Sequence, residues 1–263
     1  PLIVVDGMIY DMNDYGGSAI HNYFSNPLEF IDVKDIDNIT VVKDASSTYG
    51  AKGANGAIFI TTAHAQELAT KIDFATYTGM NITPESLPVM QAGDYRIYLT
   101  DVMKSQGYSD EFIQSRPYIT DDPGISGYYK YHNDMDWQKQ VFKNSYNQNY
   151  YIRVQGGDNI AKYSLSMGYT KHNGIVKNTD FKRYATRFNA DLNISPRVTG
   201  NASLTFTYGE HKLVDEGIAD KTNPIYLSLV KAPIFHTNEL AYEGVTSPNI
   251  ADDDIFNISN PMK

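Results

Sequence analysis

Strict alternation of apolar and polar residues over long segments is the feature that most constrains the fold of this chain. Residues 181–194 show it most clearly, because one face is largely apolar and the other largely polar. The apolar set is Tyr184, Thr186, Phe188, Ala190, Leu192 and Ile194, and the polar set is Ala185, Arg187, Asn189, Asp191 and Asn193. Because successive side chains of a strand point to opposite faces, this period of two predicts a β-strand with two unlike faces.

Four further segments predict strands, and the connections between the strands alternate in length. Residues 150–155, 163–170 and 198–208 alternate in the same way, and residues 71–80 do so less regularly. Two of the connections are short turns, Gly156–Asn159 and Ser195–Arg197, whereas 82–147 and 172–180 are longer. Tight turns force strands that are consecutive in the chain to pair, so we expect one antiparallel meander of these five strands.

Two architectures fit this pattern. Short turns at one edge and long loops at the other are typical of an outer-membrane β-barrel. A soluble secreted β-sandwich that binds glycans or peptides also has alternating strands, although its exposed face usually carries more Lys and Glu than the Ser, Thr and Asn of this sequence. The apolar face distinguishes them, because it points outward as a continuous band in a barrel wall and packs against a second sheet in a sandwich.

Residues 1–62 have a different character from the alternating segments. Short apolar runs are separated there by turns rich in Gly and Asp. The motif GAKGANG (50–56) lacks the spacing of a phosphate-binding loop and is interpreted as a tight turn before a strand. The simplest domain boundary therefore lies near residue 66.

The long connection and the end of the chain are expected to differ from each other. Apolar residues at helical spacing predict a helix over 94–106, with Asp94 as its cap, and a shorter helix near 134–142. Residues 222–263 show little periodicity and are expected to be loop. The long connection is thus predicted to be partly helical.

Composition and motifs exclude several classes of function. The 263 residues carry 22 Lys and Arg against 31 Asp and Glu and contain no run of basic residues, which argues against nucleic-acid binding. There is no Cys, the six His have no metal-ligand spacing, and no catalytic Ser motif is present. We therefore expect no enzyme, no cofactor and no metal site. Asp252–Asp254 lacks the ligand spacing of a calcium loop and predicts a solvated acidic loop.

A cluster of aromatic residues in the long connection is the strongest binding candidate. It consists of Tyr128, Tyr129, Tyr131 and Trp137, with Asp134 and Asp136 nearby. Amphipathic rings beside carboxylates are common at surfaces that bind sugars, peptides or protein partners. The alternative is that these rings only pack the loop onto itself.

Two motifs in residues 1–62 carry a resemblance to a known family. PLIVVDG (1–7) and DIDNITVVKDASSTYGAKGANGAIFITT (35–62) resemble the plug domain of SusC/RagA-type TonB-dependent outer-membrane transporters. The motif residues that match are Asp6, Gly7, Lys43, Asp44, Tyr49, Gly50, Gly53, Asn55 and Gly56. One small departure is that Ser46-Ser47-Thr48 precede Tyr49 directly, where the family usually has an extra Ala or two. Segments 136–143, 150–169, 174–195 and 223–234 resemble the first barrel strands and a loop of the same family.

The resemblance implies a fold and a function. We expect a mixed α/β plug fragment over 1–66, followed over 67–263 by an antiparallel β meander that begins a transmembrane β-barrel, with the long loop at 82–147. The implied function is a segment of an outer-membrane importer of oligosaccharides or peptides. It would act with a SusD-like surface lipoprotein and outer-membrane lipid, and with TonB, ExbB and ExbD through a region missing from this segment. On this resemblance the chain would be a piece of a longer transporter.

The resemblance together with strand parity also predicts an orientation. If the plug is periplasmic, strand 71–80 runs outward. The loops 82–147 and 171–180 would then be extracellular, and the turns at Gly156–Asn159 and Ser195–Arg197 periplasmic.

Overall fold

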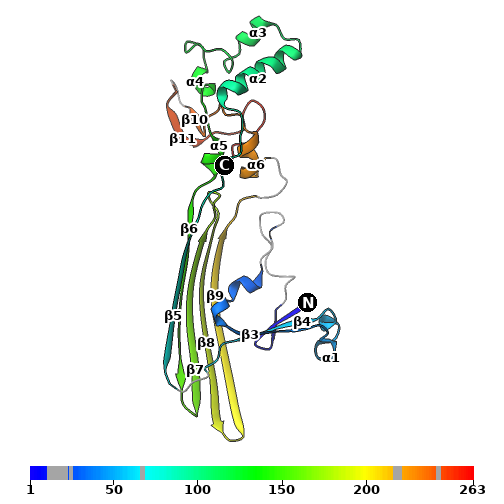
Figure 1. Ribbon diagram of the computed structural model, residues 1–263, viewed down its shortest axis with the longest axis vertical. Coiled ribbons are helices and arrows are strands. Elements are labelled where there is room, and N and C mark those ends of the chain that lie inside the picture. Colours follow the sequence, from blue (N-terminus) through cyan, green and yellow to red (C-terminus); the bar gives the residue numbers. More distant parts are fainter. Residues whose placement is uncertain (11–22, 24–25, 66–68, 216–220, 241–243) are drawn as a thin grey trace. The chain divides into compact units, whose positions relative to one another are not determined.

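The computed structural model describes residues 1–10, 23, 26–65, 69–215, 221–240 and 244–263 (Figure 1). The chain divides into two compact units. Unit 1 comprises Pro1–Asn81, Ser145–Gly174 and Thr179–Leu213, and unit 2 comprises Ile82–Asn144, Ile175–Asn178 and Val214–Lys263. Within the described ranges, no helix is both long and apolar enough to cross a membrane.

The N-terminal segment (residues 1–65) of unit 1 forms a mixed four-stranded sheet. Its strands lie in the order β2-β1-β4-β3. The strands are β1 (Leu2–Val5), β2 (Met8–Tyr10), β3 (Ile36–Val42) and β4 (Ala57–Thr62), and the short helices are η1 (Pro27–Phe30), η2 (Val33–Asp35), α1 (Ser46–Tyr49) and η3 (Gly50–Gly53). Only β1 and β4 pair in parallel, while the other two pairs are antiparallel. A small core of Ile3, Val5, Ile31 and Ile60 lies on the sheet, and Leu28 of η1 packs against it. The expected mixed α/β layout is confirmed.

A second sheet of five long strands makes up the rest of unit 1, seen side by side in Figure 1. The strands are β5 (Lys71–Asn81), β6 (Ser145–Gly157), β7 (Ala161–Asn173), β8 (Asp180–Ser195) and β9 (Val198–Lys212). Their order is β5-β6-β7-β8-β9 and every pair is antiparallel, so the predicted meander is confirmed. Each strand is longer than the alternating run that predicted it, because ladder pairing continues into polar and charged residues.

The two faces of this sheet are arranged in the reverse way to those of a sheet in a water-soluble protein, where the apolar face is buried and the polar face is exposed. The polar face is covered by the N-terminal segment, and its buried residues include Ser164, Ser166, Thr170, Arg183, Arg187 and Asn189. The apolar face is exposed, and its exposed residues include Ile72, Phe74, Tyr150, Ile152, Met167, Tyr184, Leu192, Ile194, Leu204, Phe206 and Tyr208. Water disfavours exposed apolar area of this extent. The apolar face is therefore suited to an apolar surrounding.

Unit 2 is built from short helices, two short strands and connecting loop. The helices are α2 (Ala92–Ser105), α3 (Asp110–Gln114), α4 (Tyr128–Tyr131), α5 (Trp137–Val141) and α6 (Pro224–Val230), and the strands are β10 (Asn238–Leu240) and β11 (Thr246–Ile250). Its core consists of Ala92, Tyr131, Trp137, Ala232, Ile234 and Phe235. Backbone hydrogen bonds join parts of unit 2 that are distant in the chain. In one of them, Met135 N donates to Pro233 O at 2.8 Å.

Both predicted helices of the long connection are present, with one correction. The helix predicted over 94–106 is α2, but Asp94 lies in its first turn, and Gln91 occupies the cap position. The cap acceptor for this helix end comes instead from a residue that is distant in sequence. The backbone N–H of Ala92 donates to Asp134 Oδ1 at 2.9 Å. The helix predicted near 134–142 is α5, which begins after Asp136, whose side chain accepts from Lys139 N.

The expectation that 222–263 is loop was wrong. This segment contains α6, β10 and β11 among its described residues. Asn223 caps α6 by accepting from Ile225 N and Tyr226 N, with Pro224 at the first helical position. These elements are too short to show a hydrophobic period, which explains why the sequence pattern missed them.

The predicted boundary at residue 66 lies outside the described residues. The two sheets of unit 1 fall on either side of it, whereas the two compact units divide the chain differently. The division into 1–66 and 67–263 stays a prediction.

Candidate functional site

The N-terminal segment is attached to the polar face of the five-stranded sheet by buried ion pairs. Arg183 Nη2 on β8 lies 2.7 Å from Asp32 Oδ2, and both side chains are at least nine-tenths buried. The other terminal nitrogen of Arg183 donates to the carbonyl oxygens of Glu29 and Ile31. The guanidinium thus closes on the backbone of η1 and on the residue that caps η2.

A second arginine on the same face of β8 binds two carboxylates. Arg187 Nη1 lies 3.0 Å from Asp6 Oδ2, and Arg187 Nε lies 3.8 Å from Asp35 Oδ2. Asp35 Oδ1 also accepts from the hydroxyl of Tyr151 on β6 at 2.8 Å. Buried charges are tolerated only when they are paired, so this network fixes the position of the N-terminal segment on the sheet.

The motif residues that resemble a plug domain take structural roles. Asp6 and Gly7 both have positive φ, at 48° and 83°, and form the two-residue turn between β1 and β2. The carboxylate of Asp6 also accepts from Thr62 N and Thr62 Oγ1, each at 2.8 Å. Asp6 therefore links β1, β4 and Arg187 at one point.

The glycines of GAKGANG are required by close backbone approaches. A Cβ on Gly53 would lie 2.5 Å from Ala45 O, and one on Gly56 would lie 2.8 Å from Val42 O. Gly50 and Gly56 also have positive φ, of 58° and 83°. The motif is the predicted tight turn, and it leads directly into β4.

The other motif residues lie on the surface of the same sheet. Asp44 Oδ1 accepts from Ser46 N at 2.9 Å. The hydrogen bond from the Ser46 side chain, followed by this one from its backbone, lowers the pKa of Asp44. The Tyr49 ring packs on Phe59 with centroids 5.9 Å apart. Lys43 and Asn55 are exposed.

Sequence reasoning missed most of the ion-pair network. The alternation identifies Arg187 only as one member of a polar face, and it does not single out Arg183, Asp32 or Asp35. The available signal is two arginines four residues apart on the polar side of a strand, where Ser, Thr and Asn otherwise prevail. Their partners could not be identified, because they come from residues more than 150 positions away.

The four aromatic candidates of the long connection differ in solvent exposure, and two of them are buried. Tyr131 is 9% exposed and Trp137 is 2% exposed, and both belong to the core of unit 2. Trp137 Nε1 donates to Ala232 O at 2.9 Å, which satisfies its only polar group. These two buried rings therefore pack the core of unit 2. This is the role that the alternative interpretation, packing of the loop onto itself, gave to all four rings.

The remaining two rings are accessible at the start of α4. Tyr129 is 53% exposed, and the half-buried Tyr128 stacks on His132 with centroids 3.8 Å apart. A hydrogen bond from the Tyr128 hydroxyl to Asp121 holds the ring in place and raises the pKa of Tyr128. The two tyrosines meet edge to face, with centroids 5.4 Å apart. Tyr128 and Tyr129 thus form a small, oriented aromatic surface.

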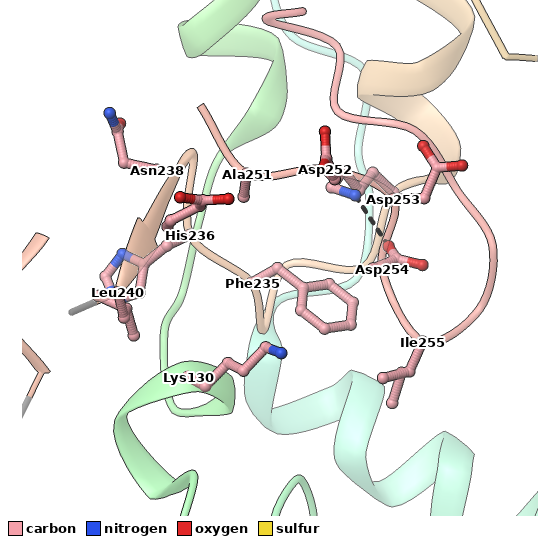
Figure 2. A pocket seen from close by; sticks show the side chains of 12 residues that line it. Lys130, Phe235, His236, Asn238, Leu240, Ala251, Asp252, Asp253, Asp254 and Ile255 are labelled. Carbon is pink, nitrogen blue, oxygen red and sulfur yellow. Dashed lines mark hydrogen bonds and ion pairs between the residues drawn. The ribbon is translucent and has the colours of Figure 1, made fainter. Parts of the chain in front are cut away.

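Unit 2 also contains a cavity of about 480 Å³ (Figure 2). Its lining includes Lys130, next to the two tyrosines in sequence, and Phe235 from the core. Figure 2 shows Asp252–Asp254 at one side of the view and His236 with Asn238 at the other. Burial lowers the pKa of His236 and thereby favours its neutral form. The cavity therefore offers donors, acceptors and an aromatic ring to a polar ligand.

The acidic run Asp252–Asp254 is only partly the solvated loop that the sequence predicts. The carboxylate of Asp254 is buried against Lys231, with Nζ and Oδ2 2.9 Å apart. Asp252 pairs with Lys263 at the surface. In the described part of the chain, no group of three or more His, Asp or Glu is arranged to hold a metal ion. His21 lies outside the described residues.

Relatives in sequence and in fold were found for this chain. No family model matches the chain. It is 30% identical over 241 residues to the TonB-dependent receptor SusC of Bacteroides thetaiotaomicron, a match that covers 86% of this chain and 21% of that protein. It is 26% identical over 231 residues to the TonB-dependent receptor P26 of Formosa agariphila, covering 85% of this chain and 21% of that protein.

Solved structures match the fold over nearly the whole chain. The structure of the RagAB peptide importer in its closed-closed state aligns with a TM-score of 0.72 and 20% identity, over 99% of this chain and 30% of that one. A structure of the RagAB peptide transporter aligns with a TM-score of 0.70 and 20% identity, over 95% of this chain and 30% of that one. The chain spans about a fifth of the length of the curated relatives, and over most of its own length it is similar to one part of the SusC/RagA-type TonB-dependent transporters.

Proposed function

We propose that this chain contributes plug and barrel wall to a TonB-dependent outer-membrane importer of oligosaccharides or peptides. In this proposal β5 to β9 are the first strands of a transmembrane barrel, and the N-terminal segment is the part of the plug inside it. The importer acts with a SusD-like lipoprotein and is energised by TonB with ExbB and ExbD. The chain has a transport role and no catalytic one.

The observation that carries the proposal is the polarity of the five-stranded sheet. Its polar face lies against the N-terminal segment, and its apolar face is exposed. A barrel wall in a membrane needs an apolar exterior and tolerates a polar interior. The alternative, a soluble sandwich, needs the apolar face to be covered by a second sheet, which the described residues do not supply.

The connections between strands support the predicted orientation. The long connection, the turn after β7 and the segment after β9 all follow odd-numbered strands of this sheet. Residues from all three gather in unit 2, and Lys143 N donates to Ile175 O at 2.8 Å. Loops of equal parity must lie at the same edge of a meander. On the proposed function this is the extracellular edge.

Epitope tags in cells that produce the transporter containing this segment test the orientation. A tag between Lys177 and Asn178 should be labelled on intact cells, and a tag after Asp158 should be labelled only after the outer membrane is permeabilised. Both positions lie in connections between strands, so insertion there spares the ladder. Labelling of the second tag on intact cells would contradict the proposal, as would a transporter that fractionates as a soluble protein.

The accessible tyrosines are proposed to contact cargo or the lipoprotein partner. Tyrosine supplies a large contact area at a small cost in side-chain entropy. In unit 2, His132 and Asp121 orient the ring of Tyr128, which in turn meets Tyr129 edge to face. The RagAB importer, which matches the fold, is described as a peptide importer. A peptide is therefore one of the two cargo classes to test, beside an oligosaccharide.

Replacing Tyr128 and Tyr129 by Ala should weaken cargo capture or lipoprotein association by about 1–3 kcal/mol. The matched control is Tyr98→Ala, because Tyr98 is also an exposed tyrosine on a helix of unit 2. The measurement is binding by calorimetry and uptake by cells, with the amount of transporter in the membrane as reference. Unchanged binding together with greater protease sensitivity of unit 2 would mean that the rings only stabilise the loop.

A further inference from the structure

The apolar face of the five-stranded sheet is crossed by a continuous row of tyrosines. Cross-strand pairing places Tyr150 opposite Tyr169, Tyr169 opposite Tyr184, and Tyr184 opposite Tyr208. The ring centroids of successive members lie 6.4, 4.9 and 6.5 Å apart. Four neighbouring strands thus present one phenol each at the same level. Tyrosine rings favour the boundary between lipid and water.

On one side of the tyrosine row, the outward face of the sheet is apolar over a length that matches the thickness of a membrane. The outward residues between Tyr184 and Ile194 on β8 are Thr186, Phe188, Ala190 and Leu192, none of them charged. Ten residue steps span roughly 33 Å along a strand, and a tilt of about 45° reduces this to roughly 23 Å along the membrane normal. That depth agrees with the apolar band of about 25 Å on outer-membrane barrels.

On the other side of the tyrosine row, the next level of the same face carries two adjacent lysines. Lys171 on β7 pairs directly with Lys182 on β8. The flanking residues at this level are Gln148 opposite Lys171 and Glu210 opposite Lys182. Like charges placed directly opposite destabilise a sheet. Glu210 can offset only one of the two lysines, so the level keeps a net positive charge.

We propose that Lys171 and Lys182 bind the phosphate of an anionic membrane lipid at the edge of the bilayer. This inference rests on the proposed barrel, since it requires the apolar face to meet lipid. The lysines lie two residues beyond the tyrosines, or roughly 7 Å along the strand, where headgroups follow the hydrocarbon region. A phosphate between the two ammonium groups removes their mutual repulsion. The flexible stems of lysine allow both groups to reach it.

The test uses the complete transporter that contains this segment, purified in neutral detergent. Native mass spectrometry measures the dissociation constant of the first bound lipid, with phosphatidic acid and phosphatidylcholine as the two probes. Each lysine contributes a factor of about five to binding of an anionic headgroup, so the double variant Lys171→Gln/Lys182→Gln should bind phosphatidic acid roughly 25-fold more weakly. Phosphatidylcholine should bind both proteins equally.

The matched control is the double variant Lys143→Gln/Lys177→Gln, which removes the same charge from two loop lysines of unit 2. It should keep the wild-type affinity for phosphatidic acid. Equal affinities of the wild type and Lys171→Gln/Lys182→Gln would overturn the inference, and so would competition by millimolar inorganic phosphate, which would indicate a site for soluble anions.

Insertion into phosphatidylcholine vesicles distinguishes this failure from failure of the proposed function. Insertion of both double variants with unchanged lipid affinity contradicts only the lysine site. Failure of the wild type to insert contradicts the barrel itself.

Discussion

Removing Arg187 should release the N-terminal segment from the five-stranded sheet. The guanidinium lies between two carboxylates, 3.0 Å from Asp6 Oδ2 and 3.8 Å from Asp35 Oδ2. The side chains of Arg187 and Asp35 are only 7% and 8% exposed. Arg187→Met keeps much of the volume and removes the charge, so both carboxylates lose the cation that they share.

The size of the effect follows from burial. Breaking a buried ion pair by removing one partner costs about 3–5 kcal/mol, because the remaining charge stays buried without compensation. Adding Asp35→Asn should recover about half of the loss. The amide removes one of the two uncompensated charges and keeps an Oδ1 acceptor for the Tyr151 hydroxyl, which now donates to Asp35 at 2.8 Å.

Hydrogen exchange of two amides of the N-terminal segment next to the ion-paired carboxylates, called here the interface amides, measures the release. The amide of Ala63 donates to Asp35 O at 2.8 Å, and the amide of Asp35 donates to Asp32 O at 2.9 Å. A loss of about 3 kcal/mol in the opening free energy should speed exchange at these amides by about 100-fold or more. The experiment is done on the folded transporter in detergent.

Arg153→Met is the matched control, since it makes the same change on the same face of the sheet. Arg153 pairs with Asp73 of the neighbouring strand at 3.0 Å, and the two side chains are 21% and 31% exposed. Its loss should cost at most about 1 kcal/mol and leave the interface amides unchanged. Unchanged exchange at Ala63 and Asp35 in Arg187→Met would refute the view that buried ion pairs hold the segment in place.

Three further substitutions test local features. Gly56→Ala should lower the unfolding free energy of the N-terminal sheet by about 1–3 kcal/mol, measured by thermal denaturation, because φ is +83° and a Cβ would lie 2.8 Å from Val42 O. Trp137→Ala should cost about 3–5 kcal/mol and expose 82–144 to protease, whereas an unchanged digestion rate would mean that this ring does not hold the core of unit 2. Asp136→Ala should cost about 1 kcal/mol at neutral pH. Burial raises the pKa of Asp136, but the hydrogen bonds from Lys139 outweigh it, so the pKa lies below its usual value. The ionised Asp136 carboxylate therefore stabilises the folded state at pH values above its unfolded-state pKa. The difference in unfolding free energy between the wild type and Asp136→Ala should vanish as the pH falls through the folded-state pKa of Asp136.

Local signals in the sequence were sufficient for the five long strands of unit 1. Alternation with period two identified all five strands, and the short turns required neighbouring strands to pair. The Asp6-Gly7 turn and the glycines of GAKGANG were also predictable, because positive φ and close backbone approach depend on a few adjacent residues. Interactions between residues that are close in the chain can be predicted from the local sequence alone.

The alternation by itself left open which face of the sheet would be covered. A period of two defines two faces, and the same pattern serves a sandwich core and a barrel wall. The tertiary structure decides which face is covered, since Asp32 and Asp35, from the N-terminal segment, meet arginines on the polar face. Pairing over such separations depends on the packed arrangement of whole elements, which local propensity does not contain.

Unit 2 shows the same limit for the candidate binding residues. The sequence identified a cluster of four rings and two possible roles for it, contact or packing. The structure divided the cluster, because Ala232 and Phe235, about a hundred residues away, cover Trp137 and Tyr131 and leave Tyr129 exposed. Residue type and spacing determined that aromatic rings would gather in this connection. Which of them remain accessible was decided only by long-range packing, because burial depends on the elements that fold over a residue and these are distant in the chain.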